Sequence, residues 1–341
     1  MEVPETEIVI IPKRVFIVPY RNRVTHKFFF CKYMKYLLED FNDYEILFLH
    51  QCDNRYFNRG AMKNIGFLTV KHKYPNDYKN ITLIFNDVDT LPFTKIFTYE
   101  TTQGVVKHYY GFTYTLGGIV VIKGGDFEQS NGYPNFWGYG MEDNCLQTRC
   151  EKIGLTIDRS HFFPIGSPEI LQLFDGISRI INKKDPWRMK NDDGIDGIKT
   201  IHNLYYSVDK ESKNIKDNVY VVDNPRMYVV NVTNFLTRVK FEGDDYYNYD
   251  LREPSRKIVH PDKIKKMTHT LMPTEEDWRN IPQTQYNAPE PRPEMENNNI
   301  HKQVYNRQSE ASIMYSPNYA KNNGIQTRAT TKSVIRLGGL R

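Results

Sequence analysis

Strand patterns and helix patterns alternate through the beginning of the chain. Short apolar runs rich in β-branched residues predict strands, and longer runs with apolar residues three and four positions apart predict helices. In order they predict a strand at 15–18, a helix at 24–41, a strand at 44–50, a helix at 58–74 and a strand at 81–85. This order implies parallel strands joined by right-handed crossover helices. The sequence therefore predicts an α/β fold, although no G-x-G-x-x-G motif follows the first strand.

Charged residues follow two strands of this predicted sheet. Asp87 and Asp89 come directly after the strand at 81–85, and Arg21 and Arg23 follow the first strand. The carboxyl ends of parallel strands meet at one edge of a sheet, where ligands bind in open α/β folds. Two carboxylates can hold a hard divalent cation, and arginine can bind phosphate oxygens with two parallel hydrogen bonds. Taken alone, each pair also fits an ordinary exposed turn.

A loop rich in glycine and aromatic residues, 131–140, runs into a helix predicted at 141–153. Before it, Gly117 and Gly118 interrupt a strand pattern, where the backbone can approach a ligand closely. One interpretation is that Glu142 and Asp143 complement the helix N-terminus while the aromatic residues fill the core. The other is that a mobile aromatic lid delivers a carboxylate to a site.

Composition limits the function classes. Hydrophobic residues make up 39% of the 341 residues and charged residues 26%, which is typical of a globular protein. The net charge of +5 comes without a compact Lys/Arg cluster, so no nucleic-acid binding is expected. Four cysteines without a C-x-x-C pair predict reduced thiols. The N-terminus has no basic leader and no apolar run of bilayer length, so we expect no membrane span and a cytoplasmic location.

The end of the chain differs in composition from the rest. Residues 281–341 carry eight Lys/Arg against four Asp/Glu, a difference of +4, and few aliphatic residues. Such a segment has too little apolar surface to offset the entropy of ordering, so it predicts a disordered basic tail that could bind an acidic partner. The predicted organisation is an N-terminal arm at 1–13, one domain at 14–240, a helical or irregular extension at 241–281 and the tail at 282–341.

Several sequence blocks occur together and in one order. They are 19–23 (Pro-Tyr-Arg-Asn-Arg), 57–67 (Phe-Asn-Arg-Gly-Ala-Met-Lys-Asn-Ile-Gly-Phe), 85–92 (Phe-Asn-Asp-Val-Asp-Thr-Leu-Pro), 117–118 (Gly-Gly) and 131–143 (Asn-Gly-Tyr-Pro-Asn-Phe-Trp-Gly-Tyr-Gly-Met-Glu-Asp). With these blocks the chain resembles the β-1,4-galactosyltransferase family, strongly over residues 14–160 and weakly to about 235. The resemblance implies a GT-A fold, a Rossmann-like mixed sheet flanked by helices.

The resemblance also implies roles for individual residues. Asp143 would be the general base, with Glu142 beside it holding the sugar, and Asp89 would coordinate Mn²⁺ or Mg²⁺. Trp137, Gly138 and Tyr139 would form a lid over the donor. The residues implied to bind the UDP-sugar donor are Arg21, Arg23, Phe57, Arg59, Asp87, Val88, Gly118, Trp137, Gly138 and Tyr139.

The chain departs from the family pattern at a few positions. Tyr139 stands where the family usually has tryptophan. Thr115 aligns with a residue that is a bulky tyrosine when the donor is galactose and smaller when N-acetylgalactosamine is accepted. Asn144 replaces an acceptor-side carboxylate. The family's second metal site, Met-x-x-His, falls on Gln172 and Asp175.

Two histidines, His161 and His202, compete with that pair as metal ligands, although a lone histidine is more often structural.

The sequence thus predicts a metal-dependent inverting glycosyltransferase. It would move galactose, N-acetylgalactosamine or a related hexose from a UDP-sugar to a hydroxyl of a glycan or glycoprotein. One alternative is a catalytically silent glycan-binding or structural protein on the same fold. Another is nucleotidyl transfer, which ordinarily needs a glycine-rich phosphate loop after the first strand, and no such loop is present.

Overall fold

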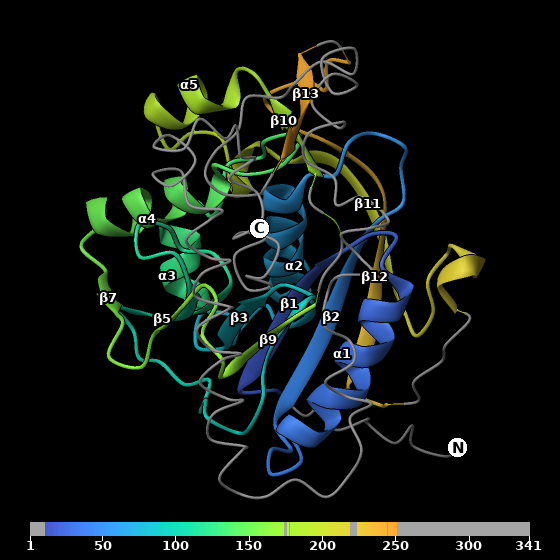
Figure 1. The fold of residues 1–341 in the computed structure, drawn as a ribbon, viewed down its shortest axis with the longest axis vertical. Helices are drawn as coiled ribbons and strands as arrows, with labels where there is room; N and C mark the ends of the chain where they lie inside the picture. The colour runs from blue at the N-terminus through green and yellow to red at the C-terminus, as the bar shows by residue number, and fades with distance from the viewer. Residues whose placement is uncertain (1–10, 174–175, 177, 219–223, 244, 251–341) are drawn as a thin grey trace, which may run out of the picture. The chain divides into compact units, whose positions relative to one another are not determined.

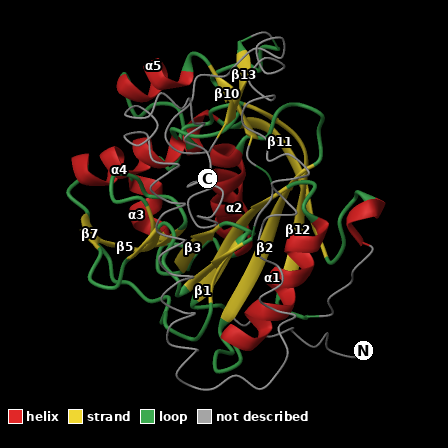
Figure 2. Ribbon diagram, viewed as in Figure 1, coloured by secondary structure: helices red, strands yellow, loops and turns green. Residues whose placement is uncertain are grey.

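The computed structural model describes residues 11–173, 176, 178–218, 224–243 and 245–250. Most of the predicted extension at 241–281, the tail, the start of the N-terminal arm and Asp175 lie outside these residues. Figures 1 and 2 show a central sheet with helices packed against it. The helices are α1 (Val24–Leu37), α2 (Arg59–Lys73), α3 (Gly124–Gln129), α4 (Glu142–Lys152) and α5 (Asp185–Lys190), with 3₁₀ turns at Ile198–Thr200 and Ile215–Asn218.

Most strands of the described residues belong to one mixed sheet. Its order is β11-β12-β2-β1-β3-β6-β5-β7, and β8 pairs with β5 outside this path. These strands are β1 (Arg14–Tyr20), β2 (Tyr44–Gln51), β3 (Thr82–Asn86), β5 (Val105–Gly111), β6 (Ile119–Lys123), β7 (Thr156–Asp158), β8 (Phe163–Pro164), β11 (His202–Asp209) and β12 (Met227–Leu236). Two small sheets pair β4 (Thr90–Pro92) with β9 (Ile170–Gln172), and β10 (Ser178–Asn182) with β13 (Tyr246–Asp250).

Strand β1 is buried on both faces of the sheet. Val15 and Ile17 join the apolar cluster that contains α2, whereas Phe16 and Val18 join the cluster that contains α1. Alternate side chains of a strand point to opposite faces, so this continuous apolar run requires a helix on each side. The predicted alternation of strands and helices over 15–85 is confirmed.

The strand directions bring several segments to one edge. Strands β2 and β3 both pair in parallel with β1, while β6 pairs antiparallel with β3. The carboxyl ends of β1, β2 and β3 and the beginning of β6 therefore lie at the same edge. Since β1 stands between β2 and β3, this is the position where open α/β sheets form a ligand crevice.

The sheet is mixed, as the resemblance to the GT-A fold implied, because β6 pairs antiparallel with β3 and with β5. The polar region 183–218 contains α5 and the edge strand β11, which the sequence patterns did not predict. All four cysteines are free thiols, as predicted. Within the described residues, no helix combines the length and apolarity needed to cross a bilayer.

Replacement of Gly118 by alanine should destabilise the fold. Gly118 has φ +77°, and an added Cβ would press on the carbonyl of Tyr110. Because positive φ and a backbone clash both disfavour a side chain here, Gly118→Ala should lower the free energy of unfolding by about 2 to 4 kcal/mol, measured by urea denaturation.

The control is Gly104→Ala, since Gly104 has φ +82° but no atom within 4 Å of an added Cβ. In that variant the free energy of unfolding should fall by only about 1 kcal/mol, because a positive φ is the one unfavourable feature there. Equal losses in the two variants would contradict the close approach of Gly118 and Tyr110.

Candidate active site

Arg59 occupies the first turn of α2, and its position is set by a local cap. The side chain of Asn58 accepts a hydrogen bond from the Ala61 backbone N–H at 2.9 Å, which satisfies a free donor of the helix N-terminus. The backbone N–H of Asn58 donates to Gln51 at the end of β2, at 2.8 Å. This cap therefore places Arg59 directly beside the carboxyl edge of the sheet.

The guanidinium of Arg59 binds three carboxylates at once. Its Nε and Nη2 donate to Asp87 at 2.7–2.9 Å. Its Nη1 donates to Glu142 at 2.6 Å and to both oxygens of Asp143 at 2.8 and 2.9 Å. The structure thus brings together residues predicted from the end of β3, the start of α2 and the start of α4.

Lys63, one helical turn after Arg59, adds a second cation. Its side chain is 1% exposed, and Nζ lies 3.1 Å from Asp143 Oδ1. Sequence analysis missed this residue, because a lysine in a helix pattern ordinarily faces water. The only sequence signal is its spacing of four from Arg59, which puts both side chains on the same helix face.

Glu142 and Asp143 differ in their electrostatic environment. Burial and the neighbouring Asp143 charge raise the pKa of Glu142. Burial alone would raise the pKa of Asp143 as well, but the positive charges of Arg59 and Lys63 outweigh it and lower that pKa. Asp143 is therefore held as a carboxylate, while Glu142 retains a proton to higher pH than an ordinary glutamate.

The two carboxyl groups also differ in access. The side chain of Asp143 is 20% exposed and that of Glu142 only 4%. Among the described residues, no donor reaches the buried Oε2 of Glu142. Gly117 lies against Asp143, since a Cβ on that glycine would sit 2.5 Å from Oδ2. Asp143 is therefore the carboxylate that an incoming hydroxyl can approach.

The backbone before α4 is bent sharply. Gly138 and Gly140 have φ +114° and +94°, and Met141, which is not a glycine, has φ +75°. This left-handed conformation costs free energy in an L-residue with a side chain. It turns the chain so that Glu142 and Asp143 begin α4 at the crevice.

The predicted lid residues are tied to their surroundings in this structure. Trp137 is 1% exposed, stacks on Phe235 and donates from Nε1 to the Val239 carbonyl at 3.0 Å. The backbone N–H of Gly138 donates to Phe57 at 3.2 Å, and that of Tyr139 to Ile180 at 2.7 Å. Closure over a donor stays a prediction.

Arg23 and Asp89 meet at this edge of the sheet, as expected from the ends of β1 and β3. Arg23 Nη1 lies 3.2 Å from Asp89 Oδ2. Strand β4 pairs with β9 so that Thr90, the next residue, faces Gln172. The amide oxygen of Gln172 accepts a hydrogen bond from Tyr110 at 2.7 Å. Val88, between the two aspartates, is buried.

Arg21 supports the neighbouring loop. Its Nη1 donates to the carbonyls of Arg55 at 2.5 Å and Asp53 at 3.4 Å. Its guanidinium also lies over the half-buried ring of Phe57, 5.4 Å from the ring centroid. These contacts place Arg21 and Phe57 beside one another.

The rival histidines lie on other elements. His202 begins β11, the edge strand of the sheet, where its Nδ1 lies 3.0 Å from the Thr200 carbonyl oxygen. His161 is exposed in the turn between β7 and β8. In the described ranges, no three His, Cys, Asp or Glu residues converge on a position that could hold a metal ion.

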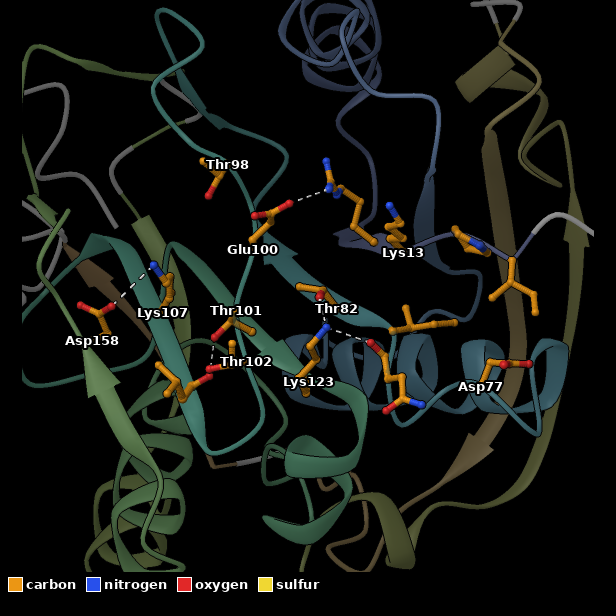
Figure 3. A pocket seen from close by; sticks show the side chains of 16 residues that line it. Lys13, Asp77, Thr82, Thr98, Glu100, Thr101, Thr102, Lys107, Lys123 and Asp158 are labelled. Carbon is orange, nitrogen blue, oxygen red and sulfur yellow. Dashed lines mark hydrogen bonds and ion pairs between the residues drawn. The ribbon is translucent and has the colours of Figure 1, made fainter.

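A cavity of about 690 Å³ lies away from this cluster, against the amino ends of β1 and β3. Figure 3 shows that several of the charged side chains lining it contact other lining residues. Lys107 pairs with Asp158 at 3.6 Å, and Lys123 donates to Thr82 at 2.8 Å. None of the predicted site residues lines it, so this cavity is not the candidate site.

Comparisons with known proteins bear on the same segment. Residues 6–102 match the family described as the N-terminal region of glycosyl transferase group 7, and residues 102–170 match the N-terminal domain of galactosyltransferase. Over residues 6–170 the chain is similar to the β-1,4-galactosyltransferase family. The predicted resemblance is confirmed for that segment.

Curated relatives cover different shares of the chain. Bovine (Bos taurus) β-1,4-galactosyltransferase 1 is 30% identical over 158 residues, which are 43% of this chain and 38% of the relative. The xylosylprotein 4-β-galactosyltransferase of Caenorhabditis elegans is 28% identical over 210 residues, 57% of this chain and 70% of that relative. The chain thus spans less than half the length of the bovine galactosyltransferase.

A solved structure shares the fold. A crystal structure of a mutant Drosophila β-1,4-galactosyltransferase 7 in complex with manganese, UDP-Gal and xylobiose aligns with a TM-score of 0.51. The alignment covers 65% of this chain and 94% of that chain at 20% sequence identity. The predicted GT-A fold is therefore confirmed.

Removal of Arg59 should destabilise the protein in a pH-dependent way. Arg59→Met leaves buried carboxylates with Lys63 as their remaining cation, so unfolding should become easier by about 3 to 5 kcal/mol at neutral pH. Without Arg59, the pKa values of Glu142 and Asp143 rise above those of the unfolded chain, so stability returns as pH falls and they bind protons.

The urea midpoint of Arg59→Met should lie closer to the wild-type midpoint at about pH 5.5 than at about pH 7.5. The control, Arg238→Met, removes an exposed pair with Asp193 and should cost less than about 1 kcal/mol. A loss in Arg59→Met that does not change with pH would contradict the charge-balance account.

Proposed function

We propose that the chain is a metal-dependent inverting glycosyltransferase that moves a hexose from a UDP-sugar to a hydroxyl of a glycan or glycoprotein. The observation that carries this proposal is Asp143, an accessible carboxylate kept ionised by Arg59 and Lys63 at the edge where Arg23 meets Asp89. Glycosyl transfer needs both features together, a base for the acceptor and cationic groups for a diphosphate leaving group.

Asp143 would act as the general base. As the acceptor oxygen bonds to the anomeric carbon of the donor, its proton passes to Asp143 and the bond to the diphosphate breaks, with UDP leaving. A single displacement with the base on the face opposite the leaving group inverts the configuration, as in inverting glycosidases. The low pKa of Asp143 supports this role, because the base must be unprotonated when the acceptor arrives.

Glu142 would hold a sugar hydroxyl. Its raised pKa and the buried Oε2, which finds no donor among the described residues, suit a group that completes its hydrogen bonds with substrate. A buried oxygen left without a partner costs free energy that a bound sugar could recover.

Two side chains, those of Asp89 and Gln172, provide oxygen atoms of the kind that hard divalent cations bind. Asp89 and Gln172 offer a carboxylate and an amide oxygen, the donor types that Mg²⁺ and Mn²⁺ prefer. When bound, such a cation would neutralise charge on the leaving diphosphate. Asp89 is already paired with Arg23, so cation binding should be weak until an anionic diphosphate engages Arg23. Asp175 stays a predicted ligand.

The remaining predicted donor contacts fit the surface next to this pair. Arg21, Arg23 and Phe57 would bind the uridine diphosphate, with Trp137, Gly138 and Tyr139 closing over it. The hydrogen bond from Gly138 to the Phe57 carbonyl supports this assignment, because it joins the lid segment to the nucleotide side of the crevice.

UDP and Mn²⁺ should stabilise the protein only together. Because Arg23 neutralises Asp89 in the absence of ligand, neither alone should shift the thermal midpoint much, while both together should raise it by several degrees, about 2–4 °C per kcal/mol of binding. Asp89→Asn should abolish the joint shift, and Asp143→Asn should retain it while losing UDP release from UDP-sugars.

A silent glycan-binding protein would show neither the joint shift nor UDP release. That result would contradict the proposed function.

Thr115 bears on the choice of donor sugar. It is buried immediately before Leu116 and Gly117, which contact the backbone and carboxylate of Asp143. In the family that the chain resembles, this position carries tyrosine when the donor is galactose and a smaller residue when N-acetylgalactosamine is accepted, so the small Thr115 favours tolerance of a 2-acetamido group on the donor. We therefore propose that N-acetylgalactosamine is accepted as well as galactose.

Thr115→Tyr should shift the ratio of kcat/KM toward UDP-galactose over UDP-N-acetylgalactosamine by about tenfold or more, because the added ring excludes the acetamido group. Steady-state kinetics with both donors measure this ratio. Thr113→Tyr, at an exposed position of the same turn, should leave it unchanged. A wild-type enzyme that already rejects UDP-N-acetylgalactosamine would contradict the proposal.

A further inference from the structure

Lys63 is the least expected charged residue of the site. Its side chain is 1% exposed in the middle of α2, between the rings of the apolar core. Its Nζ lies 4.3 Å from the ring centroid of Tyr133 and 6.0 Å from that of Phe85. An ammonium group at such a position loses nearly all its hydration.

Little hydrogen bonding replaces the hydration that the buried Lys63 ammonium has lost. Among the described residues, the hydrogen-bond acceptor of Lys63 is one atom, Asp143 Oδ1, at 3.1 Å. A well-packed apolar side chain would ordinarily be the less costly choice for a buried position. The charge therefore has a cost in stability that a single hydrogen bond does not recover.

Other charged and titratable groups also face Lys63. They are Arg59 on its own helix, Asp87 after β3, Tyr133 in the loop before α4, and Glu142 and Asp143 at the start of α4. Counted as ionised, three carboxylates stand against two cations. The proton favoured on Glu142 would make this cluster neutral.

Arg59 and Lys63 differ in the number of carboxylates that they bind. Arg59 is shared among Asp87, Glu142 and Asp143, and it lies at the position from which the donor would be bound. If the diphosphate draws Arg59 away, Asp143 loses a cation at the moment when it must stay ionised. Lys63 contacts only Asp143 among the carboxylates within hydrogen-bond distance, so it would remain.

We propose that Lys63 is a positioning residue that keeps Asp143 ionised and oriented while Arg59 engages the donor. This rests on the proposed function, in which Asp143 is the base. Lys63 holds Oδ1, and Arg59 donates to both oxygens of Asp143. Once Arg59 engages the donor, Oδ2, the oxygen facing Gly117, is left to take the proton of the acceptor hydroxyl. Burial and the neighbouring Arg59 lower the pKa of Lys63, while the carboxylates of Asp143, Asp87 and Glu142 oppose that shift. In the proposal Lys63 stays protonated throughout the transfer.

The first test is the pH profile of kcat/KM for Lys63→Met and Lys63→Arg. Without the cation the pKa of Asp143 rises, so the acidic limb of Lys63→Met should move up by about one to two pH units, with a lower kcat and little change in the donor KM. Lys63→Arg keeps the charge and should keep the wild-type limb. The control Lys71→Met removes a partly exposed lysine of the same helix and should change neither quantity.

An unshifted acidic limb in Lys63→Met would overturn the proposal, because a purely structural lysine lowers the amount of active protein without moving a pKa. So would a shift of the same size in Lys63→Arg.

A second measurement does not depend on turnover. Urea midpoints at neutral pH are compared for Lys63→Met, Asp143→Asn and the double variant. Each single variant leaves one buried charge without its partner, so the double variant should recover part of the Asp143→Asn loss.

The two measurements separate the ways of failing. Additive losses in the double variant would overturn the Lys63–Asp143 pair. Coupled losses in a protein that turns over no UDP-sugar would overturn the proposed function and the catalytic part of the inference, while the pair itself stands.

Discussion

The guanidinium of Arg59 is the group on which the rest of the site depends. It joins carboxylates from the end of β3 and the start of α4, segments that would otherwise repel each other in a mostly buried space. Its own position follows from the Asn58 cap and the link from that residue to β2. One cation at a helix N-terminus therefore sets the geometry of the whole crevice.

Two adjacent carboxyl groups acquire different properties from this arrangement. Asp143 receives hydrogen bonds from Arg59 and Lys63 and stays accessible, whereas Glu142 is buried beside it and holds a proton more readily. Differences of this kind let one site contain a base and a hydrogen-bonding acid at the same pH. The proposed function assigns the base to Asp143 and the hydrogen-bonding acid to Glu142.

Sequence patterns predicted the local elements well and the long-range contacts less well. The run from β1 to β3 was predictable because apolar periodicity is a local property, and the meeting of Arg23 with Asp89 followed from parallel strand ends. The strand β11 was missed, because it is an edge strand without buried residues and depends on pairing with β12. Burial of Lys63 could not be predicted, since only packing against Tyr133 and Asp143 distinguishes it from a surface lysine.

The most direct test of this account is a carboxyl NMR titration of Glu142 and Asp143 in the protein without nucleotide. Glu142→Gln and Asp143→Asn would assign the two signals. We predict that Asp143 stays ionised below the usual aspartate pKa, while Glu142 takes up its proton above the usual glutamate pKa. The reverse order, with Asp143 protonated at higher pH than Glu142, would contradict the assignment of Asp143 as the base.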